Sequence, residues 1–203
     1  MSNTPKRLLT GLLSLILAAC ATAQGDSDNV MATLASKQIV DQPYGWEDQD
    51  WNKSAPTQYK IEPYHLPTPT IHPGAQLIRT YALRELILSS EHPVVINVLG
   101  TAGSPVQTEG IPASVWLPGA GLADLDEEKD RRFGEALKKL TGGDPNKPLV
   151  FYCLDARCWL SYNAALRAQH WGYSNIYWYR GGIYAWWKAD LPIITQSVAY
   201  NFL

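Results

Sequence analysis

Two cysteines, Cys153 and Cys158, are the residues of this sequence best suited to chemistry. They lie between the apolar run "LVFY" and the alanine-rich pattern "WLSYNAALRA", which predict a buried strand followed by a helix. At such a junction, backbone N–H groups and the helix dipole stabilise an anion and lower the pKa of a thiol. We therefore expect Cys153 to be the reactive thiol, with Cys158 as its partner and Arg157 as an added positive charge. The residues expected to contact a substrate are Leu154, Asp155, Ala156 and Trp159.

The same pair of cysteines fits several kinds of chemistry. Cys153 could act as a nucleophile toward a sulfur compound, or the pair could exchange disulfides with a protein thiol. The pair could also form a permanent disulfide that only fixes the loop. No metal site and no cofactor are expected, because the histidines lie far from the loop in sequence and at no ligand-like spacing. These histidines are His65, His72, His92 and His170.

The segments around the loop alternate between strand and helix patterns. This alternation predicts an α/β fold, with one domain built on a mainly parallel central sheet flanked by helices. Asp124 and Glu127 are placed like a capping box at the start of one helix. The predicted strands cover residues 94–99, 147–152 and 175–179. The predicted helices cover residues 80–88, 126–140 and 160–170, with a further short helix after Gly182.

The first residues have the layout of a targeting signal. Lys6 and Arg7 precede the apolar run "LLTGLLSLILAAC", which is typical of a secretory signal and too short to span a membrane. The tetrad "LAAC" resembles a bacterial lipobox, so residues 1–19 are expected to be a lipoprotein signal peptide and Cys20 to be acylated. Cleavage after Ala23 would instead leave a free exported protein. We expect a periplasmic protein held to the membrane by its lipid anchor.

The remainder of the chain divides by composition. Residues 20–40 are expected to be a tether, and residues 41–72 an aromatic and proline-rich extension packed on the domain formed by residues 73–203. The formal net charge is −2 and no basic stripe is present, so no nucleic-acid partner is expected. An exported protein meets oxidising conditions, in which a disulfide can persist.

The Cys loop and the segments after it resemble a rhodanese domain. The resemblance is carried by "NAA" at residues 163–165, "GYSNIY" at 172–177 and "RGGIYAW" at 180–186. Upstream, "VVINV" at 94–98 and "IPA" at 111–113 fall where rhodaneses have an Asp-containing strand and an Ile-Pro-Gly-Ala turn. The resemblance implies a sulfurtransferase that carries a persulfide on Cys153 and takes a small sulfur compound or a protein thiol as its partner.

A narrower resemblance concerns "CW" at residues 158–159, the following "SYNAA", and "TIHPGA" at 70–75. These segments are similar to the exported CXXCW-motif proteins associated with pyrroloquinoline-quinone (PQQ)-dependent catabolism, which implies a periplasmic role near a quinoprotein dehydrogenase system.

The loop also departs from ordinary rhodaneses. Cys158 stands in place of their loop arginine, Ala156 in place of a glycine and Asn97 in place of an acidic residue. Three functions stay open: sulfurtransfer with Cys158 resolving the persulfide, thiol–disulfide exchange, and a binding module with a structural disulfide.

Overall fold

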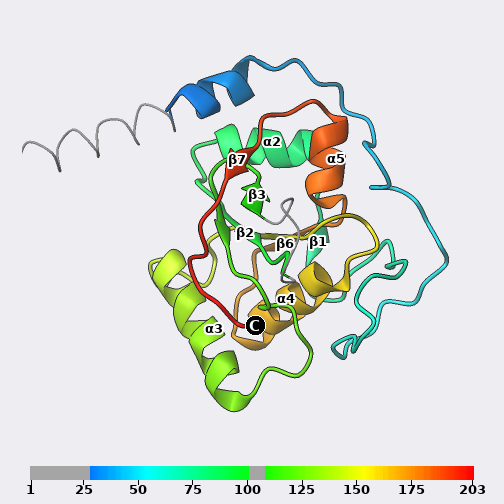
Figure 1. Cartoon of the computed structure of the whole chain (residues 1–203), viewed down its shortest axis with the longest axis vertical. Coiled ribbons are helices and arrows are strands. Elements are labelled where there is room, and N and C mark those ends of the chain that lie inside the picture. The colour runs from blue at the N-terminus through cyan, green and yellow to red at the C-terminus, as the bar shows by residue number, and fades with distance from the viewer. Residues whose placement is uncertain (1–27, 101–107) are drawn as a thin grey trace, which may run out of the picture.

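The computed structural model describes residues 28–100 and 108–203 (Figure 1). The expected signal peptide, the acylated Cys20 and the first part of the tether lie outside the described residues. Within the expected tether, residues 28–36 are helical, and Leu34 of this helix is fully buried against the domain. In the part of the chain that the structure describes, no helix has the length and apolar character needed to cross a membrane.

The centre of the molecule is a parallel sheet of five strands in the order β1-β6-β5-β2-β4. The central strand β5 is buried along its whole length, as expected for a short apolar strand of a parallel sheet covered on both faces. A second, two-stranded antiparallel sheet pairs β3 with β7. The strands are β1 (Gln76–Leu77), β2 (Val94–Asn97), β3 (Glu109–Gly110), β4 (Ser114–Trp116), β5 (Leu149–Tyr152), β6 (Ile176–Tyr179) and β7 (Ile194–Thr195).

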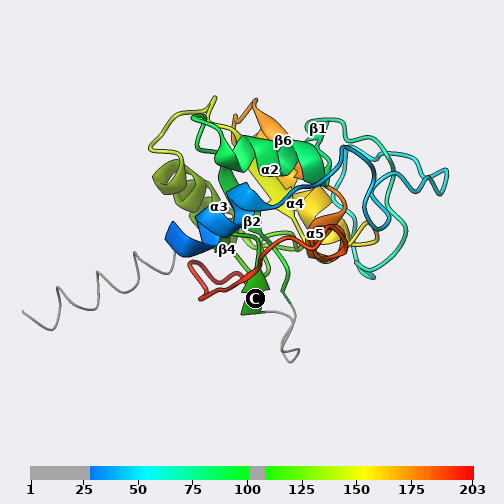
Figure 2. The ribbon, with the colours of Figure 1, turned by 90° about the horizontal axis from the view of Figure 1, so that it is seen from above.

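Helices cover both faces of the central sheet (Figures 1 and 2). They are α2 (Thr80–Leu88), α3 (Glu127–Leu140), α4 (Trp159–His170) and α5 (Gly182–Lys188). Alternate strand residues point to opposite faces. On one face, Phe151 of β5 packs in a core with α3 and α4, and on the other face Val150 packs in a core with α2 and α5. The predicted α/β architecture is therefore confirmed.

The start of α3 differs in detail from the expectation. The helix is capped by Asp126, whose Oδ1 accepts the N–H of Lys129 at 2.7 Å, rather than by Asp124. Asp126 has the extended backbone of an N-cap residue. The two aspartates are only two residues apart, so the sequence pattern did not separate them.

Helix α4 is unusual because residues 159–168 are all buried. A helix that packs only on a sheet would leave one side in solvent. Here the N-terminal extension covers that side: Tyr162 Oη donates to the carbonyl of Pro56 at 2.7 Å, and Asn163 exchanges hydrogen bonds with the backbone of Lys60. The extension is therefore part of the structure around the Cys loop, which directly precedes α4.

Candidate functional site

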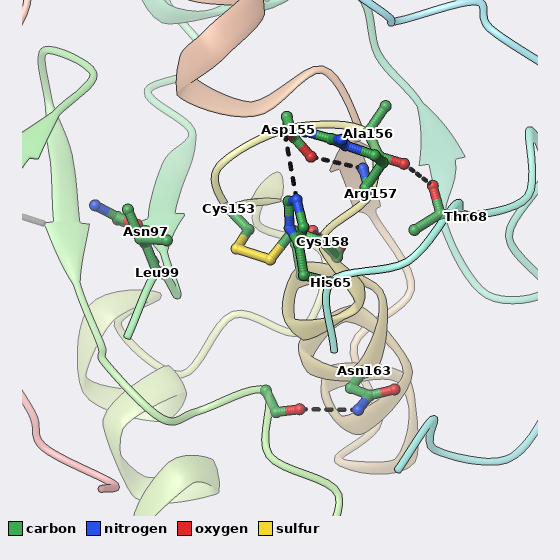
Figure 3. Close-up of a disulfide and its surroundings, with 12 residues drawn as sticks. His65, Thr68, Asn97, Leu99, Cys153, Asp155, Ala156, Arg157, Cys158 and Asn163 are labelled. Carbon is green, nitrogen blue, oxygen red and sulfur yellow. Dashed lines mark hydrogen bonds and ion pairs between the residues drawn. A yellow bond between two sulfur atoms is a disulfide. The ribbon is translucent and has the colours of Figure 1, made fainter. Parts of the chain in front are cut away.

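The Cys loop connects the end of β5 to the start of α4, at the carboxyl edge of the parallel sheet. Open α/β sheets commonly bind ligands at this edge. Cys153 follows the last residue of β5, and Cys158 is the N-cap residue of α4. The two cysteines form a disulfide with their Cα atoms 6.1 Å apart (Figure 3). Both are buried, with 1% of Cys153 and 6% of Cys158 exposed.

Three N–H groups of the loop region are bound by the protein itself. The N–H of Arg157 donates to Asp155 Oδ1 at 2.8 Å, and the N–H of Cys158 donates to the Asp155 carbonyl at 3.0 Å. The N–H of Trp159 donates to the carbonyl of Tyr64 at 2.9 Å. The sequence led us to expect such groups to converge on an anion, but these three are directed at protein acceptors.

The buried carboxylate of Asp155 binds other groups of the loop. Its carboxylate is 5% exposed, and Oδ2 pairs with Arg157 Nη2 at 3.0 Å. The guanidinium carbon of Arg157 also lies 4.2 Å from the ring centroid of Trp46, which belongs to the extension. Because the charges of Asp155 and Arg157 largely offset each other, the loop presents little net positive charge to an anionic ligand.

A segment of the extension runs antiparallel to the loop. The N–H of Leu66 donates to the Arg157 carbonyl at 2.8 Å, and the hydrogen bond between Trp159 and Tyr64 closes the other end. Between these bonds His65 stands directly opposite Cys158. Sequence analysis set His65 aside because of its distance along the chain, and the aperiodic extension carried no signal that could have paired it with the loop.

A cavity of about 580 Å³ opens beside the disulfide. Cys158 lines it, whereas Cys153 is not among the described residues that do. Tyr64, His65 and Glu62 supply the polar part of the lining. The apolar lining consists of Leu99, Leu122, Leu154, Leu160 and Leu203.

The four expected substrate-contacting residues divide between the cavity and the interior. Leu154 lines the cavity, and Asp155 is buried in the loop. Ala156 is fully buried, and its carbonyl accepts hydrogen bonds from the backbone and hydroxyl of Thr68. Trp159 is 5% exposed and packs against Tyr162 with ring centroids 5.0 Å apart. Of the four, only Leu154 contributes to the wall of the cavity.

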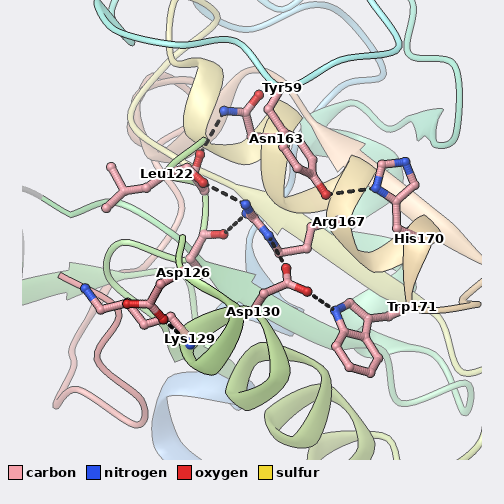
Figure 4. A network of polar contacts seen from close by, with 11 residues as sticks. Tyr59, Leu122, Asp126, Lys129, Asp130, Asn163, Arg167, His170 and Trp171 are labelled. Atoms are coloured by element: carbon pink, nitrogen blue, oxygen red, sulfur yellow. Dashed lines mark hydrogen bonds and ion pairs between the residues drawn. The ribbon is translucent and has the colours of Figure 1, made fainter. Parts of the chain in front are cut away.

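The part of the cavity wall that contains Leu122 is held in place by a buried arginine of α4 (Figure 4). Arg167 donates to the carbonyls of Ala120 and Leu122 at 2.7 and 2.8 Å, and its Nε binds Asp130 of α3 at 2.9 Å. Asn163, one turn earlier, donates to the carbonyl of Gly121 at 2.9 Å. These bonds fix the segment that carries Leu122 against α4.

Within residues 28–100 and 108–203, no group of three or more histidine, cysteine, aspartate or glutamate side chains is arranged to hold a metal ion. His65 is the histidine that the fold brings to the Cys loop. His72 is bound instead to the backbone of Tyr162 and Gly74. A disulfide, an imidazole and a carboxylate lie together at the Cys loop.

Comparison with known proteins agrees with this architecture. The family model described as the rhodanese-like domain matches residues 106–189, so this part of the chain is similar to that domain. No curated protein matches the sequence significantly.

Two solved structures are among those similar to this chain. A thiosulfate sulfurtransferase from Pseudomonas aeruginosa is 17% identical, with a TM-score of 0.47, over 64% of this chain and 22% of its own. A polysulfide-sulfur transferase from Wolinella succinogenes is 19% identical, with a TM-score of 0.42, over 61% of this chain and 81% of its own.

Proposed function

We propose that this protein is an exported rhodanese-like protein whose Cys153–Cys158 pair undergoes reversible disulfide exchange with protein thiols. The observation that carries this proposal is the disulfide of the Cys loop. One of its cysteines, Cys158, lines a mainly apolar cavity. Disulfide exchange needs an accessible sulfur and a neighbouring group that handles the proton, and the cavity places Cys158 beside His65.

The electrostatics of the loop favour this chemistry over attack on thiosulfate. A thiosulfate ion carries two negative charges, which a site must balance with N–H groups or cations. Here the amides of Arg157, Cys158 and Trp159 bind protein acceptors, and the guanidinium of Arg157 is paired with Asp155. An uncharged or hydrophobic thiol suits the cavity better, because leucines dominate its lining.

Sulfurtransfer is the second candidate function, and the match to the rhodanese-like domain favours it. In the reduced protein, the thiolate of Cys153 would attack the outer sulfur of a persulfide or polysulfide donor, and the rest of the donor would leave as a thiolate. Cys158 would then attack Cys153 Sγ, re-forming the disulfide and releasing sulfide. Alternatively, an acceptor thiol would take the outer sulfur and leave Cys153 reduced.

We place the protein in the periplasm, anchored through an acylated Cys20 and working near a quinoprotein dehydrogenase system. The supports for this placement are the signal and lipobox pattern and the resemblance to CXXCW-motif proteins. Metabolic labelling with a radioactive fatty acid tests the anchor. The label is expected in the wild type and absent from Cys20→Ala, and equal labelling of both would contradict the assignment.

Thiol trapping tests the redox function. The folded protein is equilibrated with dithiol buffers of graded potential, quenched with an alkylating reagent and weighed by intact-mass spectrometry. Stepwise conversion from no alkylated thiol to two on the Cys153–Cys158 pair is expected without loss of the fold. A disulfide that opens only on unfolding would show that it is purely structural.

The same samples distinguish sulfurtransfer. Incubation of the reduced protein with polysulfide should add 32 Da to Cys153 if the second candidate holds. The adduct should be absent from Cys153→Ser and persist longest in Cys158→Ser, which lacks the resolving thiol. Absence of any adduct from both the wild type and Cys158→Ser would remove sulfurtransfer.

A further inference from the structure

His65 and Cys158 occupy directly opposed positions in the short antiparallel pairing between the extension and the loop. The two hydrogen bonds of this pairing are made by the residues on either side, Leu66 with Arg157 and Trp159 with Tyr64. The opposed pair is thus of the non-hydrogen-bonded type, in which the Cα atoms approach to about 4.5 Å and the side chains lie on one face. The geometry brings an imidazole next to a sulfur atom.

Asp155 completes the arrangement on the other side of the imidazole. His65 Nε2 lies 4.0 Å from Asp155 Oδ2, and Figure 3 shows the ring of His65 beside the disulfide with a dashed line to Asp155. Asp155 is held by Arg157 and is 5% exposed, whereas the side chain of His65 is 50% exposed. At this distance the carboxylate acts on Nε2 through its charge rather than through a hydrogen bond, and a hydrogen on Nε2 leaves the lone pair of Nδ1 to accept a proton.

From this arrangement we infer that His65 is the acid–base group of the site, that Asp155 positions it, and that Cys158 is the sulfur attacked first. This inference rests on the proposed exchange function, and it gives Cys158 the leading part that the sequence pattern assigned to Cys153. Cys158 lines the cavity, and Cys153 is the more buried of the two cysteines, with 1% exposed. The substrate is a dithiol carried by a partner, because a second partner thiol is needed to release the mixed disulfide from Cys158.

The steps balance as a two-electron exchange. The first partner thiol gives its proton to His65 while its sulfur bonds to Cys158 Sγ. The Cys153–Cys158 bond breaks, its electron pair goes to Cys153, and this thiolate takes up the proton that His65 received, which returns His65 to its neutral form. The second partner thiol then loses its proton to His65 and attacks the first partner sulfur. Cys158 departs as a thiolate and receives that proton, so the partner becomes a disulfide and the cysteine pair becomes two thiols.

Three charged groups lie around His65. Asp155 faces the ring from the loop, Arg157 pairs with Asp155, and Glu62 lines the same cavity from the extension. The neutral imidazole of His65 accepts the proton of the incoming thiol, so the exchange rate no longer depends only on the thiolate fraction of the substrate.

The first experiment determines which sulfur is reached from solvent. The variants Cys153→Ser and Cys158→Ser, each also carrying Cys20→Ala so that one cysteine remains, are treated with an aromatic disulfide, 5,5′-dithiobis(2-nitrobenzoate), and release of the coloured thiolate is followed. Cys158 in Cys153→Ser should react about tenfold or more faster than Cys153 in Cys158→Ser. The reason is that access of the reagent to the attacking sulfur limits the reaction rate. Equal rates, or a faster Cys153, would overturn the assignment of Cys158.

The second experiment tests His65 in the otherwise unchanged protein. The rate of disulfide reduction by dithiothreitol is measured between pH 5 and pH 9 for the wild type, His65→Asn and the matched control His92→Asn. His92 is exposed and has a φ of 47°, which asparagine tolerates. At neutral pH, His65→Asn should be about 100-fold slower, the lower end of general base catalysis, and the control should match the wild type.

The shape of the pH profile separates a chemical role from a structural one. Without His65 the rate should fall about tenfold for each pH unit below the pKa of dithiothreitol, following its thiolate fraction, whereas the wild type falls less steeply. Asp155→Asn retains an acceptor for the Arg157 N–H and should move the profile from that of the wild type toward that of His65→Asn, because the ring is less well positioned. Identical profiles for the wild type and His65→Asn would overturn the role of His65, whereas a disulfide inert in every variant would overturn the exchange function itself.

Discussion

His72 should make the protein lose stability in mild acid. The residue precedes β1, where Nε2–H donates to the carbonyl of Tyr162 at 3.1 Å and Nδ1 accepts the N–H of Gly74 at 3.0 Å. Both nitrogens are therefore satisfied only in the neutral ring. Burial disfavours the imidazolium and lowers the pKa of His72 to about 4, although the Tyr162 carbonyl opposes this shift.

The magnitude follows from linkage. The unfolded chain binds a proton on His72 near pH 6.5, whereas the folded chain does so only near pH 4, so the unfolded state gains protons first as the pH falls. The contribution of His72 is fully present above pH 6.5 and is lost between pH 6.5 and 4. The loss is about 2 kcal/mol between pH 7 and pH 5, and it approaches roughly 3.4 kcal/mol below pH 4.

Urea unfolding at pH 7 and pH 5, followed by tryptophan fluorescence, measures this loss. His72→Gln keeps a polar side chain but removes the titration, so its free energy of unfolding should change about 2 kcal/mol less than that of the wild type between the two pH values. Comparing the two differences cancels the other titrating groups. His92→Asn serves as the control and should follow the wild type. A His72→Gln variant with the same pH dependence as the wild type would refute the reasoning.

Three further predictions concern the parts that hold the loop. Arg180→Ala removes the donor to the backbone carbonyls of Trp46, Glu47, Gln49 and Thr68, and should lower the free energy of unfolding by roughly 3 kcal/mol and expose residues 46–68 to protease. Gly182→Ala should lower it by roughly 2 kcal/mol or more in urea unfolding, because φ is 62° and a Cβ would lie 2.5 Å from the Cys153 carbonyl oxygen. Reduction of the disulfide should cost about 2 kcal/mol in the same assay, since the two cysteines close only a short loop.

Each of these three predictions would be contradicted by a different result. Unchanged protease resistance in Arg180→Ala would show that other contacts hold the extension. Wild-type stability in Gly182→Ala would mean that the loop moves aside freely. A reduced protein as stable as the oxidised one would show that the disulfide does not restrict the unfolded chain.

Local patterns were sufficient to predict most of the elements. The predicted helix 80–88 has the same bounds as α2. The predicted strand 94–99 is two residues longer than β2, which ends at Asn97. These predictions succeed because apolar periodicity reports which faces of a segment are buried. The position of Cys153 at the end of β5 follows from the same local signal.

The surroundings of the cysteines could not be predicted in this way. The N–H group of Trp159 donates to the carbonyl of Tyr64, and the hydroxyl of Thr68 donates to the carbonyl of Ala156. Residues distant along the chain therefore decide which polar groups of the loop remain available to a ligand. The extension has no periodicity that reveals these partners. Arg180 fixes it in place through several backbone carbonyls, a function that no sequence spacing indicates.

The sequence by itself thus determined the α/β order of elements and the placement of a cysteine pair between a buried strand and a helix, because both depend on contacts that repeat within a few residues. Only the tertiary structure decided that His65 lies opposite Cys158 and close to Asp155, and that Cys158 lines the cavity. The physical reason is that these relations depend on how the extension docks against the loop. That docking is set by hydrogen bonds and burial between segments far apart in the chain.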